Sequence, residues 1–363
     1  MSSPIINLLI TADYELFLGR NFLSDDEVLF APTRELLDLS RRIDVPITFF
    51  ADVCSVWAHR DSGIEKYPHL FEQQLCDAVR DGHDVQLHLH PHWLFSSFRD
   101  GEWRVSTDRM YMAELGYDDT HLSAPVVIRR GIDYLNRLIQ PVNSDYKCIA
   151  FRAAGLALQP RERELISALL ESGILLDSSV VKGVRFKLDT IEIDYSNAPT
   201  SANWFMNPET GVTAPSTSGL FEIPIGTFKM DILNRLEFIW RRAISVKMLR
   251  GTGVSRSQRQ STLANMKTLI KYNLRYLYTN PWFNLSCDTK GYDLKMLLTG
   301  FNDYVARHSD GENIFVSLIN HPKMMFTPQL ELLESLVTTT RNKYRDRIRF
   351  ITFSEALKQI RSD

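Results

Sequence analysis

Four of the nine histidines in the chain lie within one ten-residue stretch, at positions 83, 88, 90 and 92. Imidazole is the commonest metal-binding side chain in proteins. His88 and His92 stand four residues apart, a spacing that meets one ion if the segment turns helically. A lone histidine usually packs or faces solvent, but this density indicates a metal site. We therefore expect His88 and His92 to bind the ion and His90 to pack or contact substrate, with no role assigned to His83.

A pair of carboxylates, Asp13 and Glu15, follows the first predicted strand in the segment Thr-Ala-Asp-Tyr-Glu. Carboxylates next to a buried strand are costly unless they have partners. Neighbouring charges also push the pKa values of two carboxyl groups apart. One member of the pair can then bind a metal ion while the other acts as a base. The alternative is a solvated loop or a helix N-cap.

Three further polar groups follow predicted strands. Arg152 lies in Phe-Arg-Ala-Ala-Gly, Asp177 precedes two serines, and His321 precedes a proline. Each group alone is weak evidence, because such residues at strand ends are often structural. The carboxyl ends of parallel strands are, however, where barrel enzymes build their active sites. We therefore expect all five groups to converge at one edge of the sheet.

Short apolar runs alternate with longer helical patterns along most of the chain. Strands that alternate with helices of about 10–15 residues predict parallel βαβ units, and so an α/β fold. The predicted strands are residues 5–11, 47–51, 84–88, 147–151, 174–176, 313–319 and 347–352. The predicted helices are residues 33–43, 69–80, 120–139, 160–173, 328–339 and 354–360.

Residues 183–310 break this alternation and are predicted to be an insertion into a barrel formed by 1–182 and 311–363. The insertion begins with β-like pieces and continues as basic helices, in which eleven Lys and Arg stand against two acids between positions 229 and 275. Basic segments of this kind with large apolar residues can lie on an anionic membrane surface. The alternative is a set of packing helices with a solvated basic face. The aromatic residues concerned are Phe238, Trp240, Tyr272, Tyr276, Tyr278 and Trp282.

Composition narrows the compartment and the partners. The formal net charge is -2, so no global field would draw the molecule to nucleic acid, and we expect no nucleic-acid partner. Four dispersed cysteines without a CxxC pair favour reduced thiols. The first residues lack a basic signal-peptide region, and no apolar run reaches the length of a membrane span. These features predict a cytoplasmic protein, peripheral at the inner membrane face if the basic segment binds lipid.

The ordered motifs resemble the polysaccharide-deacetylase (NodB-homology, carbohydrate esterase 4-like) family. The resemblance covers about residues 1–182 and 311–363, and it implies a deformed (β/α) barrel that holds one divalent metal ion, for which we expect Zn²⁺. In that family one carboxylate and two histidines bind the ion. The motifs are Thr-x-Asp-x-Glu, Thr-Phe-Phe, Gly-His-Asp-x-x-x-His-x-x-x-His, Phe-Arg-x-x-Gly, Asp-Ser-Ser and His-Pro.

The resemblance also implies roles for single residues. His88 and His92 match the paired histidine ligands. Asp13 matches the general base, and Glu15 stands for the acidic metal ligand. Many members have two adjacent aspartates where this chain has Asp-Tyr-Glu, so Asp13 and Glu15 could exchange roles and both are candidate ligands.

The remaining roles concern the base and the acid. Arg152 matches the arginine that orients the base, His321 the general acid, and Asp177 the aspartate that tunes that acid. The arginine motif lacks the family's proline and aromatic residue, and no tryptophan follows Asp177, which leaves the substrate open.

The resemblance implies hydrolysis of an N-acetyl group on a sugar of a surface polysaccharide, or on its lipid- or nucleotide-linked precursor. The partners would be that N-acetylated glycan and, through residues 228–282, a membrane surface or a lipid-linked glycan. Two alternatives remain: hydrolysis of another non-peptide C–N bond, as in a cyclic amide split by an allantoinase-like enzyme, or an inactive membrane-associated glycan-binding protein.

Overall fold

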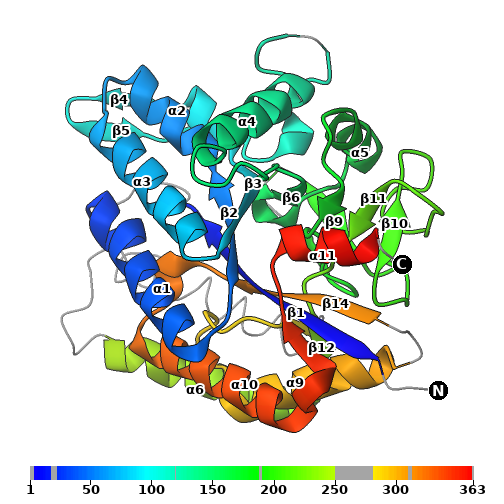
Figure 1. Cartoon of the computed structure of the whole chain (residues 1–363). Helices are drawn as coiled ribbons and strands as arrows, with labels where there is room; N and C mark the ends of the chain where they lie inside the picture. The colour runs from blue at the N-terminus through cyan, green and yellow to red at the C-terminus, as the bar shows by residue number, and fades with distance from the viewer. Residues whose placement is uncertain are drawn as a thin grey trace.

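The central feature of the protein is one curled sheet surrounded by helices (Figure 1). The structure is a computed structural model that describes residues 4–17, 23–118, 120–187, 190–249, 281–309 and 313–361. In this part of the chain the sheet has nine strands, in the order β10-β11-β7-β6-β3-β2-β1-β14, with β15 paired to the first half of β1. All pairs are parallel except β10 with β11. The expected α/β fold is therefore confirmed.

The strands of the sheet include all seven predicted apolar runs, together with β10 and β11 from the range 183–310. They are β1 (Ile5–Tyr14), β2 (Ile47–Asp52), β3 (Asp84–Leu89), β6 (Ala150–Ala153), β7 (Leu176–Asp177), β10 (Trp204–Met206), β11 (Leu220–Glu222), β14 (Asn313–Asn320) and β15 (Ile348–Phe350). Strand β1 is buried on both faces, as parallel strands covered by helices are. It continues to Tyr14, beyond the predicted end at residue 11, so Asp13 lies inside the strand.

Residues 223–226 draw the two sides of the sheet together. The backbone N–H of Ile225 donates to the carbonyl of Val180 at 3.1 Å, while that of Gly226 donates to the carbonyl of Ser317 in β14 at 2.9 Å. Ile225 thus bridges the segment after β7 and the strand at the opposite end of the sheet. The sheet is consequently a deformed barrel, as expected.

Amphipathic helices cover the outside of this barrel. In α4 the buried residues recur every three or four positions, which turns one face toward the sheet. Gly131 lies on that face, and a Cβ there would stand 2.7 Å from Cδ1 of Leu87, so glycine lets α4 approach β3 closely. The helices are α1 (Ala31–Ile43), α2 (Val53–Asp61), α3 (Lys66–Arg80), α4 (Ala124–Ile139), α5 (Glu162–Glu171), α6 (Ile232–Leu249), α9 (Leu294–Arg307), α10 (Thr327–Tyr344) and α11 (Phe353–Ile360).

Short elements fill the connections. The two-stranded pairs are β4 (Ser97–Arg99) with β5 (Glu102–Arg104), β8 (Arg185–Lys187) with β9 (Glu192–Asp194), and β12 (Thr227–Lys229) with β13 (Trp282–Asn284). The short helices are η1 (Asp26–Phe30), η2 (Pro91–Phe95), η3 (Met112–Glu114), η4 (Ala154–Leu156), η5 (Pro322–Met324) and η6 (Arg345–Arg347).

The range 183–310, expected as an insertion, is built into the barrel. Its strands β10 and β11 extend the main sheet beyond β7. Its β12–β13 pair is fixed by Phe228, whose ring meets Gly300 of α9, where a Cβ would lie 2.4 Å from the ring. Phe238 of α6 is buried and packs 5.3 Å, between ring centroids, from Phe283 of β13. These contacts place α6 and the β12–β13 pair against the same side of the barrel.

Helix α6 also carries an apolar stripe that faces solvent. Ile232, Leu233, Leu236 and Trp240 are 48%, 74%, 48% and 64% exposed. Residues 250–280, which hold three of the expected aromatic residues and six of the expected cations, lie outside the described residues. In the described ranges no helix has the length and apolarity to cross a bilayer. Membrane contact through 228–282 therefore stays a prediction.

Candidate active site

Strand register brings the predicted polar groups to the carboxyl edge of the barrel. Asp52 at the end of β2 stands opposite His88 of β3, and His88 stands opposite Arg152 of β6. On the other side, Ala12 of β1 pairs with Asn320 of β14, so Asp13 and His321 follow at the same level. Parallel strands end together at this edge, which explains why distant sequence segments meet here.

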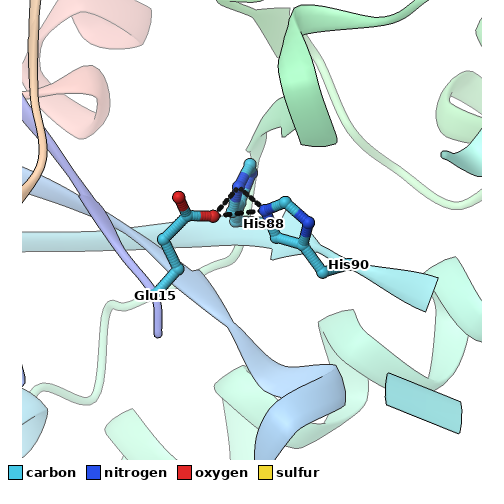
Figure 2. A group of neighbouring side chains, drawn as sticks. All are labelled: Glu15, His88 and His90. Carbon is cyan, nitrogen blue, oxygen red and sulfur yellow. Dashed lines mark hydrogen bonds and ion pairs between the residues drawn. The ribbon is translucent and has the colours of Figure 1, made fainter. Parts of the chain in front are cut away.

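Glu15, His88 and His90 form a buried three-residue group (Figure 2). Nε2 of His88 lies 3.1 Å from Oε2 of Glu15 and 3.0 Å from Nε2 of His90. Nε2 of His90 also contacts Oε2 of Glu15. The three ligand atoms all lie within 4.8 Å of one another, and no other such group occurs in the part of the chain that the structure describes.

His90 takes the place that the spacing argument gave to His92. A helical turn after His88 would bring His92 beside it, but residues 84–89 form strand β3. Side chains in a strand return to the same side every second residue, so His90 follows His88. His92 lies in the short helix η2, with both ring nitrogens buried and unpartnered among the described residues. Burial, followed by the nearby His90, lowers the pKa of His92 to about 3.

The donor set of the group fits a divalent metal ion. Nδ1 of His88 lies 2.7 Å from the carbonyl oxygen of Arg152, so Nδ1 carries the proton and the lone pair of Nε2 faces the group. Two imidazole nitrogens and a carboxylate oxygen that face each other in a buried group are ligands typical of catalytic zinc sites. Three protein ligands also leave coordination positions open. Glu15, His88 and His90 are therefore the residues that would hold the ion.

Lys323 and Asp52 fix this group from behind. The ammonium of Lys323 donates to Oε1 of Glu15 at 2.7 Å and to the carbonyl of Leu16 at 2.8 Å. Burial would raise the pKa of Glu15, but Lys323 and the two histidines hold it well below its usual range. Oδ1 of Asp52 accepts the backbone N–H of His90 at 3.0 Å. The sequence reading missed both residues, although Lys323 follows the His-Pro motif and Asp52 ends the strand of Thr-Phe-Phe.

Arg152 anchors Asp13 in the barrel interior. The guanidinium is fully buried, and its Nη1 lies 2.5 Å from Oδ1 of Asp13. Its other donors reach Thr11, Ser178 and Ser317 at 2.8–2.9 Å, so every N–H has an acceptor. Asp13 lies outside the three-ligand group, and its Oδ2 stands 3.6 Å from Nε2 of His321. Arg152 therefore binds Oδ1 of Asp13, and Oδ2 faces His321.

Asp288, not Asp177, is the carboxylate that binds Nδ1 of His321. Nδ1 of His321 lies 2.6 Å from Oδ2 of Asp288, and the other oxygen accepts from the Ser286 hydroxyl. Burial would lower the pKa of His321, but Asp288 and the carboxylates of Asp13 and Glu15 raise it above its ordinary value. The expectation that Asp177 tunes the acid is corrected accordingly. Asp288 lay in the range expected to be an insertion, where no motif marked it.

Asp177 belongs to a different buried pair. It stands opposite Glu222 of β11 and accepts both the N–H and the hydroxyl of Ser179, at 2.8 and 3.0 Å. Burial raises the pKa of both carboxyls, and repulsion from Asp177 holds that of Glu222 well above its usual range. The pair supports the wall behind Arg152 through Ser179, whose hydroxyl accepts the N–H of Ala153 at 2.9 Å.

A cavity of about 670 Å³ opens over these residues. Asp13, Glu15, His88, His90 and His321 line its floor. Residues of β8, α6, β13 and the loop after β13 line its walls, so the range 183–310 shapes the space above the catalytic edge. The volume is in the range of about 300–1,000 Å³ that is usual for small-molecule sites.

No protein-family model matches the chain, and no curated protein matches it. Among solved structures it is similar to one described as a polysaccharide deacetylase from Mycobacterium smegmatis, with 11% identity, a TM-score of 0.47, and coverage of 99% of this chain and 92% of that one. A structure described as a polysaccharide deacetylase from Pseudomonas aeruginosa PAO1 has 14% identity and a TM-score of 0.42, and the match covers 96% of this chain and 89% of that one. The structure of an allantoinase has 14% sequence identity and a TM-score of 0.43, and the match covers 96% of this chain and 88% of that one.

Proposed function

We propose that the protein is a metal-dependent hydrolase that removes an N-acetyl group from a sugar. The observation that carries the proposal is the Glu15–His88–His90 group, with the carboxylate of Asp13 and the imidazole of His321 beside it. A buried ligand set next to a base and an acid is what amide hydrolysis at neutral pH requires. The sugar substrate is supported by the motif resemblance and by the size of the cavity.

A divalent ion held by the three ligands would polarise the amide carbonyl and lower the pKa of a water molecule. Asp13 takes the proton of the attacking water on Oδ2, because Arg152 holds Oδ1 on the side away from the cavity. The buried guanidinium fixes the orientation of the carboxylate, so no reorganisation is needed when the proton moves.

His321 supplies the proton that the leaving nitrogen requires. Asp288 holds Nδ1, which directs Nε2 toward Asp13 and Glu15 at 3.6 and 3.8 Å. A protonated imidazole in this orientation can protonate the departing amine at Nε2. The products are acetate and an amino sugar.

Metal analysis combined with acetate release tests this proposal. The purified chain, reconstituted with zinc or cobalt, should hold one ion and release acetate from N-acetylated sugars. Glu15→Ala should lose the ion, whereas Asp13→Asn should keep it and lose turnover, since Asp13 lies outside the ligand group. His69→Ala, which changes an exposed histidine of α3, is the matched control for variants of the histidine ligands. If Asp13→Asn loses the ion and Glu15→Ala keeps it, the two roles are reversed.

Two other outcomes would redirect the proposal. Ammonia or ring-opened product from a cyclic amide, without acetate release from any N-acetylated sugar, would favour hydrolysis of another C–N bond. An ion that binds without any turnover, together with glycan binding, would favour a binding protein.

A further inference from the structure

The cavity over this edge is lined by both carboxylates and cations. Its floor holds the carboxylates of Asp13 and Glu15, and Asp288 lies in the loop after β13 that lines the wall. Its outer wall holds four cations, Arg185, Lys187, Arg242 and Lys290, which come from β8, α6 and the loop after β13. A neutral N-acetylated sugar carries no charge that these cations would balance.

Among the residues that the structure describes, three of these four cations have no carboxylate partner. Arg185 is neutralised by Glu192 at 2.6 Å and by Asp194 at 3.6 Å. By contrast, no carboxylate of the described residues forms an ion pair with Lys187, Arg242 or Lys290. Arg241, the neighbour of Arg242 in α6, does form an ion pair, with Asp293 at 2.9 Å. Within the described ranges, α6 thus pairs Arg241, which lies outside the cavity lining, and offers no carboxylate to Arg242, which lines the cavity.

The fold holds Arg242 and Lys290 close to each other. Gly291, at a φ of 99°, lies against α6, and a Cβ there would stand 2.8 Å from the carbonyl oxygen of Phe238 and 3.1 Å from Cβ of Arg242. Tyr292 packs on Phe238 with 5.3 Å between ring centroids, which fixes the loop on the helix. Burial lowers the pKa of Lys290, and repulsion from Arg242 lowers it further. Two cations held together without a counter-charge form a site that an anion would stabilise.

We propose that Arg242, Lys290 and Lys187 bind a phosphate-type group of the substrate. This inference rests on the proposed function and narrows it: the substrate is an N-acetylated sugar that carries a phosphate or diphosphate, linked to a nucleotide or to a lipid. Guanidinium and ammonium groups together are the usual ligands of phosphate, because arginine binds two oxygens at once and lysine adds a point charge. The sugar then reaches the floor while the phosphate stays at the wall.

Binding measurements test the anion site without depending on turnover. Inorganic pyrophosphate should bind the wild-type chain in isothermal titration calorimetry, with an affinity that falls as salt rises. The variants Arg242→Gln and Lys290→Gln should each weaken binding by about tenfold, as expected for the loss of one charge-assisted contact. Lys295→Gln removes an equal charge from the exposed face of α9, outside the cavity, and should bind pyrophosphate like the wild type. Equal affinity in all four proteins, or tighter binding of a sugar carboxylate than of pyrophosphate, would overturn the assignment.

Substrate comparison separates this inference from the proposed function. Acetate release should be faster from a nucleoside-diphosphate N-acetyl sugar, or from its polyprenyl-diphosphate counterpart, than from the free N-acetyl sugar, and Arg242→Gln should remove the difference mainly through KM. The ratio of the first two rates identifies the carrier. Acetate release that is equally fast from the free sugar would refute the anion site and leave the hydrolase proposal standing. Pyrophosphate binding that Arg242→Gln abolishes, without acetate release from any substrate, would keep the site and refute the hydrolase proposal.

Discussion

Replacing Arg152 by methionine should destabilise the protein strongly, even in the absence of a metal ion. The guanidinium is fully buried and satisfies Asp13, Thr11, Ser178 and Ser317 at once. Methionine can keep the packing on Phe50, whose ring centroid lies 4.1 Å from the guanidinium carbon. The cost therefore comes from polar groups that are left without a partner.

The magnitude follows from the burial of Asp13, which is 3% exposed. Removing one member of a buried ion pair costs about 3–5 kcal/mol, because the remaining charge stays out of water. Replacing Asp13 by asparagine in the same chain removes that charge. The double variant Asp13→Asn with Arg152→Met should therefore recover about 1–3 kcal/mol relative to the sum of the single variants.

Urea unfolding at pH 7 in the presence of a chelator measures these free energies without a contribution from metal binding. Arg349→Met is the matched control, since Arg349 is exposed on β15 and its loss should change stability by less than about 0.5 kcal/mol. A loss below about 1 kcal/mol for Arg152→Met, or strict additivity in the double variant, would refute the view that Arg152 neutralises Asp13 in the folded chain.

Four further outcomes are expected. His90→Ala should lose the metal ion in elemental analysis, whereas His92→Ala should retain it. The reverse result would show that His88 and His92 are the histidine ligands. Asp288→Asn should keep the ion and lower kcat about 10²–10⁴-fold, because it removes the negative charge that raises the pKa of His321 and keeps this general acid protonated. Unchanged kcat would exclude Asp288 from the mechanism. Burial raises the pKa of Asp84 to about 6, so the folded state favours the protonated form of this carboxyl. The free energy of unfolding should therefore fall, by on the order of 3 kcal/mol, as pH rises from about 4 to above 6. Urea unfolding of Asp84→Asn should lack this decline, and an unchanged decline would assign it to another group. Co-sedimentation with anionic liposomes should weaken with salt and in Trp240→Ser, which removes an exposed aromatic ring of α6; absence of binding at low salt would end the membrane prediction.

The sequence by itself determined the barrel and the strand ends that carry polar groups. Alternating apolar runs and helical patterns are local signals, so they survive without knowledge of tertiary contacts. Asp13, His88 and His321 each follow or end such a run, and the structure places all three at one edge of the sheet. The prediction of parallel βαβ units is sufficient to place these residues at one edge, because the strands of such units all run in the same direction.

Only the tertiary structure decided which side chains meet. The choice between His90 and His92 depends on whether the chain stays extended after His88, and the histidine spacing fits either course. Asp288 is 33 positions from His321 in the sequence, and Glu222 is 45 positions from Asp177. Such partners are set by how the range 183–310 folds back onto the barrel, and local periodicity contains no information about that return. The cations of the cavity wall were likewise decided by the tertiary structure. Charges far apart in the sequence become a binding site only when packing holds them together without counter-charges.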